Sequence, residues 1–195
     1  IENAIVESYD NERDVVISWS KFIKELDPDI LTGYNIWDFD EPFIYDRAKN
    51  GNAGETGDYS EILLRNLSRN KEKIADFKIK ELSSSALGKN FLKYIDIEGI
   101  IQIDLYKLMQ KDYKLDSYKL DNVCKHFMKE QKEDLTPKQL FNNYSIGTPD
   151  LIKQIATYCI QDNILCNRLI NKLNVISNNV GMANVCCVPL SYLFL

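Results

Sequence analysis

The first fifty residues carry two different hydrophobic patterns. Between residues 12 and 26 apolar side chains recur at helical spacing, which predicts an amphipathic helix with an inward face of Val15, Trp19, Phe22, Ile23 and Leu26. Residues 30–33 form a short apolar run that predicts a buried central strand. Pro42 suits the first turn of a helix, so the strand is expected to lead through Asp40 into a helix that ends near Lys49, before a glycine-rich loop over 50–54.

Alternating apolar residues flank Gly99, with Ile95 and Ile97 before it and Ile101 and Ile103 after it. The alternation predicts two strands, and the glycine between them predicts a hairpin. A further turn is expected over residues 83–88, where serine and glycine gather.

From Asp104 onward the pattern becomes helical. One stripe carries Leu105, Leu108 and Met109, and Ser117 is expected to cap the next helix, whose inward residues are Leu120, Val123, Cys124, Phe127 and Met128. Thr136 and Gln139 predict a capping box at the start of a third helix. Thr148 and Pro149 predict the start of the longest helix, which is expected to reach about Asn174.

That longest helix contains a carboxylate in its apolar stripe. The predicted inward positions are Ile152, Ile155, Cys159, Asp162, Cys166, Leu169 and Leu173. No Lys or Arg lies three or four residues from Asp162, and an unpaired buried carboxylate costs several kcal/mol, so a metal ion or a polar site is the economical explanation. Tyr158 lies one turn earlier on the same face. The alternative is a surface pair on a helix with a shifted register.

Asp40 is the second carboxylate of interest, because it falls where the predicted strand ends and the next helix begins. Ligands bind at this edge of open α/β sheets. The alternative is that Asp40 only caps the helix.

Composition narrows the class of protein. The chain has 195 residues, 45% of them hydrophobic, and no run of the roughly 18 apolar residues that a membrane span needs, which predicts one soluble domain or a piece of one. Because the sequence begins at Ile1 and ends in an apolar segment, we expect it to be part of a longer protein, and no targeting signal can be read from its ends.

Five cysteines form no C-x-x-C pair and His126 is the single histidine, which argues against a zinc site. The same pattern favours reduced thiols, with Cys124, Cys159 and Cys166 in the core.

Charge is unevenly distributed along the chain. The net charge is −5, which argues against a self-sufficient DNA-binding protein. Residues 65–93 nevertheless carry eight Lys and Arg against three acidic residues, a local balance of +5. This run is either a solvated surface or a face near a nucleic-acid backbone.

Several segments resemble family B DNA polymerases. The run from Asp27 through Gly33, Asn35 and Phe39 to Asp40 is similar to their second exonuclease motif, and Tyr158-x-x-x-Asp162 is similar to the third. The segments between these motifs, and Gly181 to Leu193 after them, resemble the delta-type catalytic subunit and its relatives in large DNA viruses. The resemblance covers nearly the whole chain in order.

The resemblance implies an α/β, RNase H-like exonuclease fold with a mixed central sheet flanked by helices, truncated at its N-terminal strands. It implies two divalent metal ions, Mg²⁺ or Mn²⁺, held by Asp40 and Asp162, with Tyr158 orienting the attacking water. Asn35 and Phe39 would contact the 3′-terminal nucleotide. Residues 1–175 would be part of the 3′–5′ exonuclease domain, and 176–195 the start of the connection toward the polymerase domain.

The chain departs from the family pattern in two places. The first exonuclease motif, an Asp-x-Glu pair on a strand before Asp40, is not present. Asp96 and Glu98 have the right residue types but follow Asp40 on the predicted hairpin, so we interpret them as a coincidence and expect them to face solvent. Asp38 stands where relatives usually carry Asn, which adds negative charge beside the site.

Taken together, these features predict a fragment of a DNA-directed DNA polymerase that covers its proofreading exonuclease domain. The alternatives are a stand-alone exonuclease of the same fold and a non-catalytic, exonuclease-like DNA-binding scaffold. The implied partners are a single-stranded 3′ end or primer–template DNA, dNTP in a polymerase domain outside this sequence and a sliding clamp, with no membrane. The source is expected to be a large eukaryotic DNA virus, acting in the host nucleus or a cytoplasmic viral factory.

Overall fold

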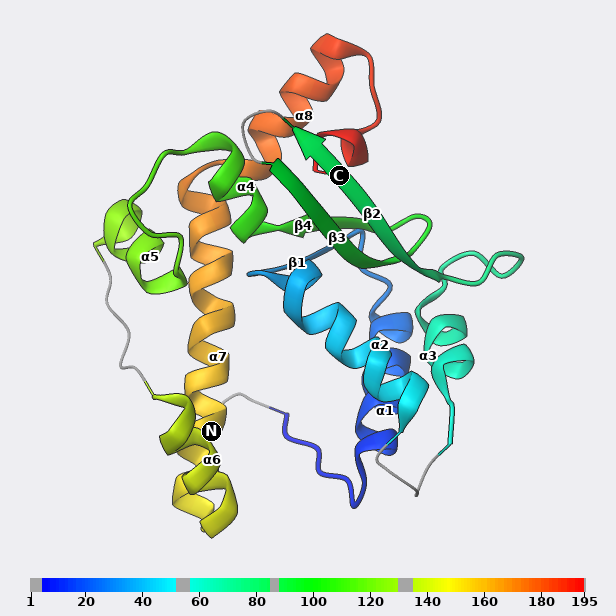
Figure 1. Ribbon diagram of the computed structural model, residues 1–195, viewed down its shortest axis with the longest axis vertical. Coiled ribbons are helices and arrows are strands. Elements are labelled where there is room, and N and C mark those ends of the chain that lie inside the picture. The colour runs from blue at the N-terminus through cyan, green and yellow to red at the C-terminus, as the bar shows by residue number, and fades with distance from the viewer. Residues whose placement is uncertain (1–4, 52–56, 85–87, 130–134, 195) are drawn as a thin grey trace. The chain divides into compact units, whose positions relative to one another are not determined.

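The computed structural model describes residues 5–51, 57–84, 88–129 and 135–194, and it divides into two compact units (Figure 1). The N-terminal unit is Val6–Asp104, and the C-terminal unit is Leu105–Leu195 together with Ile1–Ile5. The loop expected over 50–54 and the turn expected over 83–88 lie partly outside the described residues.

The N-terminal unit combines helices with two small sheets. Its elements in chain order are α1 (Glu12–Leu26), β1 (Ile30–Gly33), a π-helical turn η1 (Ile36–Asp40), α2 (Glu41–Asn50), α3 (Ser60–Leu67), β2 (Asp76–Ser84), β3 (Gly88–Asp96) and β4 (Ile101–Asp104). β1 pairs with β4 in parallel, with Gly33 opposite Asp104, and β2 pairs with β3 antiparallel (Figure 1). The predicted α/β class, strand 30–33 and helix after Asp40 are confirmed.

The hairpin predicted about Gly99 is wrong. The segments on its two sides do form strands, but β3 pairs with β2 and β4 pairs with β1. Gly99, at φ +90°, turns the chain between the two sheets, and the turn is closed by a hydrogen bond from Ile100 N to Ile97 O of 3.2 Å. Alternation located the buried side chains Ile95 and Ile103 correctly, because it reports which face is covered and not which strand is the neighbour.

The core of the N-terminal unit joins α1, α2 and α3 to the end of β3. Its buried members are Val16, Ile23, Ala48, Tyr59, Leu63, Leu67, Ala75, Ile95 and Ile97. A second, smaller cluster holds Trp37 against Leu92 and Tyr94. Trp37 is 1% exposed, so it anchors the turn η1 in the interior.

The inward face predicted for α1 is partly wrong. Ile23 is buried and Trp19 packs against the core, but Val15, Phe22 and Leu26 are exposed. The buried stripe instead runs through Val16 and Ser20. Ser20 is tolerated there because its hydroxyl donates to Ile17 O at 2.7 Å and accepts from Asn66 Nδ2 at 3.0 Å, which a count of apolar residues cannot anticipate.

The C-terminal unit is helical in its described residues. Its elements are α4 (Leu105–Asp112), α5 (Leu120–Met128), α6 (Pro137–Ile146), α7 (Pro149–Lys172), α8 (Val175–Cys186) and η2 (Leu190–Leu193). The predicted capping box of Thr136 and Gln139 is confirmed at the start of α6. Ser117 does not cap α5 as predicted, because Lys119 occupies the N-cap position and its side chain makes no cap hydrogen bond.

The stripe predicted for α7 is confirmed only toward its C-terminal end, where Cys166 and Leu169 are buried. Ile152 and Cys159 are exposed, so Cys159 is not the core residue that was predicted, whereas Cys124 is. In the part of the chain that the structure describes, no helix has the length and apolar character needed to cross a membrane.

Candidate active site

The turn that carries Asp40 is fixed by the residues at the ends of β1 and β4. A Cβ on Gly33 would lie 2.5 Å from Cγ2 of Ile36, so the close return of the chain after β1 requires glycine. Asn35 then adopts a left-handed conformation with φ 65°, and η1 begins at Ile36. π-Helical turns are rare and occur frequently at functional sites.

Asp104, at the end of β4, holds this turn in place. Its Oδ1 accepts a hydrogen bond from Asn35 N at 2.9 Å, and its Oδ2 accepts one from Trp37 N at 3.2 Å. The indole of Trp37 donates to Gln102 Oε1 at 3.3 Å, a second tie to the same strand. Asp104 was not predicted as a site residue, although an aspartate directly after the alternating residues Ile101 and Ile103 was a usable signal.

Asp40 is the last residue of η1 and precedes the first residue of α2. Its side chain makes no capping hydrogen bond and its backbone is already in the helical region, so the alternative that Asp40 serves as a cap is not supported. The side chain is exposed, yet nearby protein atoms desolvate the carboxylate enough to raise its pKa, while a hydrogen bond from its own backbone lowers it. The carboxylate is therefore available to an external ligand.

Glu41, the next residue, is a buried acid that the sequence analysis missed. It is 5% exposed, and its Oε2 accepts a hydrogen bond from Ile95 N at 2.6 Å. The pKa of Glu41 is raised to about 8, mainly by burial and also by the charges of Asp104 and Asp40, while the hydrogen bond from Ile95 N lowers it. Among the described residues Oε1 has no hydrogen-bond partner. Nothing in the sequence around Glu41 indicated that its side chain is buried, since its neighbour Asp40 is exposed.

Asn35 and Phe39 lie on the same turn as Asp40, as the sequence predicted. Oδ1 of Asn35 is buried and has no hydrogen-bond partner among the described residues. Phe39 is 65% exposed and stacks on Phe43, with ring centroids 6.2 Å apart and planes inclined by 8°. Exposed aromatic rings of this kind are platforms for nucleic-acid bases. Phe43 was missed, although its spacing of four from Phe39 predicts contact on a helix.

Tyr158 and Asp162 lie one turn apart on α7, and both are partly buried. Each makes an interaction within the structure, so neither is an isolated group. The negative charge of Asp162 adds to burial in raising the pKa of the Cys159 thiol. The structure brings Asn35, Phe39 and Asp40 together in one unit and Tyr158 and Asp162 together in the other, and the convergence of the two groups stays a prediction.

Asp96 and Glu98 are engaged in surface ion pairs. Asp96, at the end of β3, pairs with Lys78, and Glu98 pairs with Lys73 at 3.6 Å and accepts from Asn70 Nδ2 at 3.2 Å. Glu98 is exposed and Asp96 is partly so. These partners give both carboxylates a structural explanation.

The carboxylates of the candidate site suit hard cations such as Mg²⁺ and Mn²⁺, which bind oxygen ligands. Over the described residues, however, no three Asp, Glu, His or Cys side chains are grouped so as to hold a metal ion. The carboxylates of Asp40 and of Asp162 each have the chemistry of a ligand for such an ion.

Comparison with known proteins identifies the family of this chain. The family described as DNA polymerase family B, exonuclease domain, matches residues 1–123. The chain is 37% identical to a DNA polymerase of Pyramimonas orientalis virus over 241 aligned positions, which cover 94% of this chain and 19% of that protein. It is 40% identical to the DNA polymerase delta catalytic subunit of Dictyostelium discoideum (99% of this chain, 17% of that protein) and 41% identical to that of Plasmodium falciparum (95% and 16%).

The chain therefore spans less than a fifth of the length of these curated relatives. Its small sheets and helices are consistent with an exonuclease domain of the RNase H-like type, which confirms the predicted fold class. Exonuclease domains of that family generally depend on divalent metal ions.

Proposed function

Because this chain belongs to the family B DNA polymerases, where it matches the exonuclease domain, we propose that it covers most of the 3′–5′ proofreading exonuclease domain of a DNA-directed DNA polymerase. The single observation that carries the proposal is that the carboxylate of Asp40, at the end of η1, makes no capping hydrogen bond. Asp40 lies within residues 1–123, which match the exonuclease-domain family. In this proposal residues 1–175 belong to the exonuclease domain and 176–195 begin the connection toward the polymerase domain.

Asp40 and Asp162 have the roles of metal ligands. Both are carboxylates, and the raised pKa of Asp40 reflects a desolvated anion that a cation would stabilise. When bound, two divalent ions, Mg²⁺ or Mn²⁺, supply activation of a water and stabilisation of the departing 3′ oxygen of a phosphodiester. The missing ligands would come from an Asp-x-Glu strand outside this sequence.

The remaining site residues act on the nucleotide and the water. The Tyr158 hydroxyl orients the attacking water by a hydrogen bond. Asn35 contacts the 3′-terminal nucleotide by hydrogen bonding, and the exposed Phe39 ring packs on it. The hydrogen bonds from the backbone of Asn35 and Trp37 to Asp104 keep Asn35 and Phe39 in position on the turn.

The natural substrate in this proposal is the 3′ end of a DNA strand, and the polymerase activity, with its dNTP and a sliding clamp, lies with residues outside the chain. One of the relatives reported above is viral, the polymerase of Pyramimonas orientalis virus, and we keep a viral source, acting in the host nucleus or a viral factory, as part of the proposal. A non-catalytic scaffold is disfavoured because both Asp40 and Asp162 are present.

The test uses the complete polymerase with a primer whose 3′ end is mismatched. Asp162→Ala should abolish removal of the mismatched nucleotide while leaving extension of a matched primer unchanged. Loss of both activities would indicate misfolding, and retention of excision would contradict the assignment. A matched change at an exposed residue of the same helix, Asn163→Ala, is the control.

A further inference from the structure

A basic pocket lies at the opposite ends of the strands from Asp40. It is lined by Asp27, which comes shortly before β1, and by Ile100, which directly precedes β4. Because β1 and β4 are parallel, their starts share one edge of the sheet and the Asp40 turn follows the other. A strand of four residues spans roughly 13 Å, so the pocket is separate from the catalytic turn.

Cations dominate the walls of this pocket, which has a volume of about 390 Å³. The positively charged members are Lys24, Arg65, Arg69 and Lys71, whereas Asp27 is the one acidic residue among the described residues that line it. Leu67 and Ile74 add apolar surface. The pocket is thus positive within a chain whose net charge is −5.

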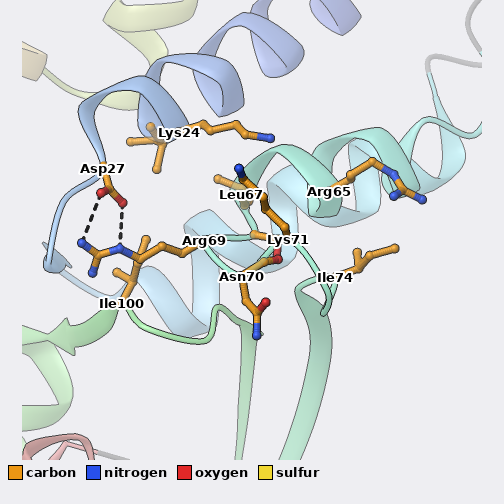
Figure 2. Close-up of a pocket in the computed structure, with 11 residues that line it drawn as sticks. Lys24, Asp27, Arg65, Leu67, Arg69, Asn70, Lys71, Ile74 and Ile100 are labelled. Atoms are coloured by element: carbon orange, nitrogen blue, oxygen red, sulfur yellow. Dashed lines mark hydrogen bonds and ion pairs between the residues drawn. The ribbon is translucent and has the colours of Figure 1, made fainter.

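Arg69 forms a fixed wall. Its Nε lies 2.7 Å from Asp27 Oδ1, as Figure 2 shows, and its Nη1 lies 2.9 Å from Asp29 Oδ1 and 2.7 Å from Gly99 O. These contacts join the end of α1, the start of β1 and the turn before β4. Arg69 is therefore occupied by the protein and shapes the pocket more than it binds a ligand.

Lys24 and Lys71 supply positive charge to the pocket that no acidic side chain neutralises by an ion pair among the described residues. Neither has an ion-pair partner among the described residues, and both are exposed. In Figure 2 their side chains extend toward the same part of the pocket. Arg65 pairs with Glu61 at 2.8 Å in an exposed contact between helical neighbours. Such a surface pair contributes little, so Arg65 can also turn to an anion.

We propose that this pocket binds phosphate groups of the DNA backbone, at a distance from the excision site; the inference rests on the proposed function. Backbone contacts in protein–DNA complexes come largely from Lys and Arg and carry no sequence information. A solvated lysine at the end of α1 would complement the helix dipole, which accounts for Lys24. It does not account for Lys71, which lies in the loop after α3 and faces the same pocket.

The test measures binding of fluorescein-labelled dT30 and of a primer–template to the complete polymerase, in EDTA, from 50 to 300 mM NaCl. The K24A/K71A variant should bind about tenfold more weakly at low salt, and the slope of log affinity against log salt should fall by about two, roughly one for each lost phosphate contact. The matched control is K21A/K138A, which removes the same charge from exposed lysines outside the pocket.

Weaker binding with a reduced slope in K24A/K71A alone supports the proposal. An equal effect in both variants would overturn it, since the cause would be general charge. Unchanged DNA binding in both variants would also overturn the proposal. The pocket would then be filled by solvent or bind an acidic protein segment. Hydrolysis of the p-nitrophenyl ester of thymidine 5′-monophosphate, which reaches only the excision site, should stay unchanged in K24A/K71A. Failure of the wild-type polymerase to hydrolyse this ester would contradict the proposed function. The DNA-binding measurement would still decide whether the pocket binds phosphate groups.

Discussion

Asp104 Oδ2 accepts a hydrogen bond from the backbone N–H of Trp37 at 3.2 Å, which ties the end of β4 to the middle of the turn that ends at Asp40. The same carboxylate also accepts from the N–H of Asn35 at 2.9 Å, and it is 2% exposed. One buried acid thus satisfies two backbone donors of η1. The position of the candidate catalytic residue depends on a residue in a distant part of the sequence.

Replacing Asp104 should therefore impair excision without touching substrate. In Asp104→Asn only one oxygen remains as an acceptor, so one N–H of the turn loses its partner, at a cost of about 1–3 kcal/mol. We expect mismatch excision by the complete polymerase to fall by about tenfold or more, with primer extension retained. Asp112→Asn, at an exposed end of α4, is the matched control and should behave as wild type. Full excision activity in Asp104→Asn would show that these hydrogen bonds do not position the site.

Asp40→Asn should remove excision and leave the fold intact. The side chain makes no capping hydrogen bond, so helix α2 does not depend on it, whereas a neutral amide is a poor ligand for a divalent ion. The expected loss is about a hundredfold or more, measured as release of the 3′ nucleotide from single-stranded DNA. The thermal unfolding temperature should not change.

The paired variant Asp96→Asn, Glu98→Gln serves as the control for that experiment. Both residues form ion pairs with lysines, and neither is assigned to the site. The excision rate should stay near that of the wild type. A hundredfold loss would mean that this Asp-x-Glu pair takes part in the chemistry after all.

Glu41 should make the local stability depend on pH. In the folded protein its pKa is raised from 4.5 to about 8, so the folded state keeps a proton that the unfolded chain releases. Stability from this group is complete below pH 4.5 and is lost as the pH rises toward 8. Hydrogen exchange at Ile95 N–H, which donates to Glu41, should lose protection over this range in EDTA, after correction for the intrinsic exchange rate.

Glu41→Gln keeps an acceptor for Ile95 and removes the titration. Exchange at Ile95, corrected for the intrinsic rate, should then be nearly independent of pH between 5 and 8. A wild-type protein with the same flat profile would contradict the predicted titration of Glu41.

The 195-residue chain alone is expected not to degrade DNA. No strand with an Asp-x-Glu pair precedes Asp40 among the described residues, so a metal ion would lose ligands, and without such a strand β1 would keep an unpaired edge. Extending the protein upstream through that strand should restore cleavage of single-stranded DNA with Mg²⁺ or Mn²⁺. If the 195-residue chain cleaved DNA and Asp162→Ala abolished that cleavage, residues already present in the chain would complete the site.

Local patterns predicted the elements whose signals are contained in a few residues. The strand 30–33, the helix that starts at Pro42 and the capping box at Thr136 each depend on neighbours in sequence, and all are present. The hairpin about Gly99 failed because strand partners are chosen by packing across the chain, and alternation does not encode the partner.

The candidate site was predictable to a similar extent. Asn35, Phe39 and Asp40 were located from a motif, and the structure puts them on one turn. The supporting residues Asp104 and Glu41 were missed because their roles come from burial against distant backbone groups, Trp37 N and Ile95 N. Such contacts arise only when the chain has folded.

The most direct test of the central claim is a crystal structure of the complete polymerase with Mn²⁺ and a short single strand, with anomalous data at the manganese edge. If Asp40 and Asp162 share one metal site, two anomalous peaks should lie roughly 4 Å apart, with oxygens of both carboxylates in the coordination shell. Peaks that contact only one of these carboxylates, or carboxylates too far apart to share a metal pair, would contradict it.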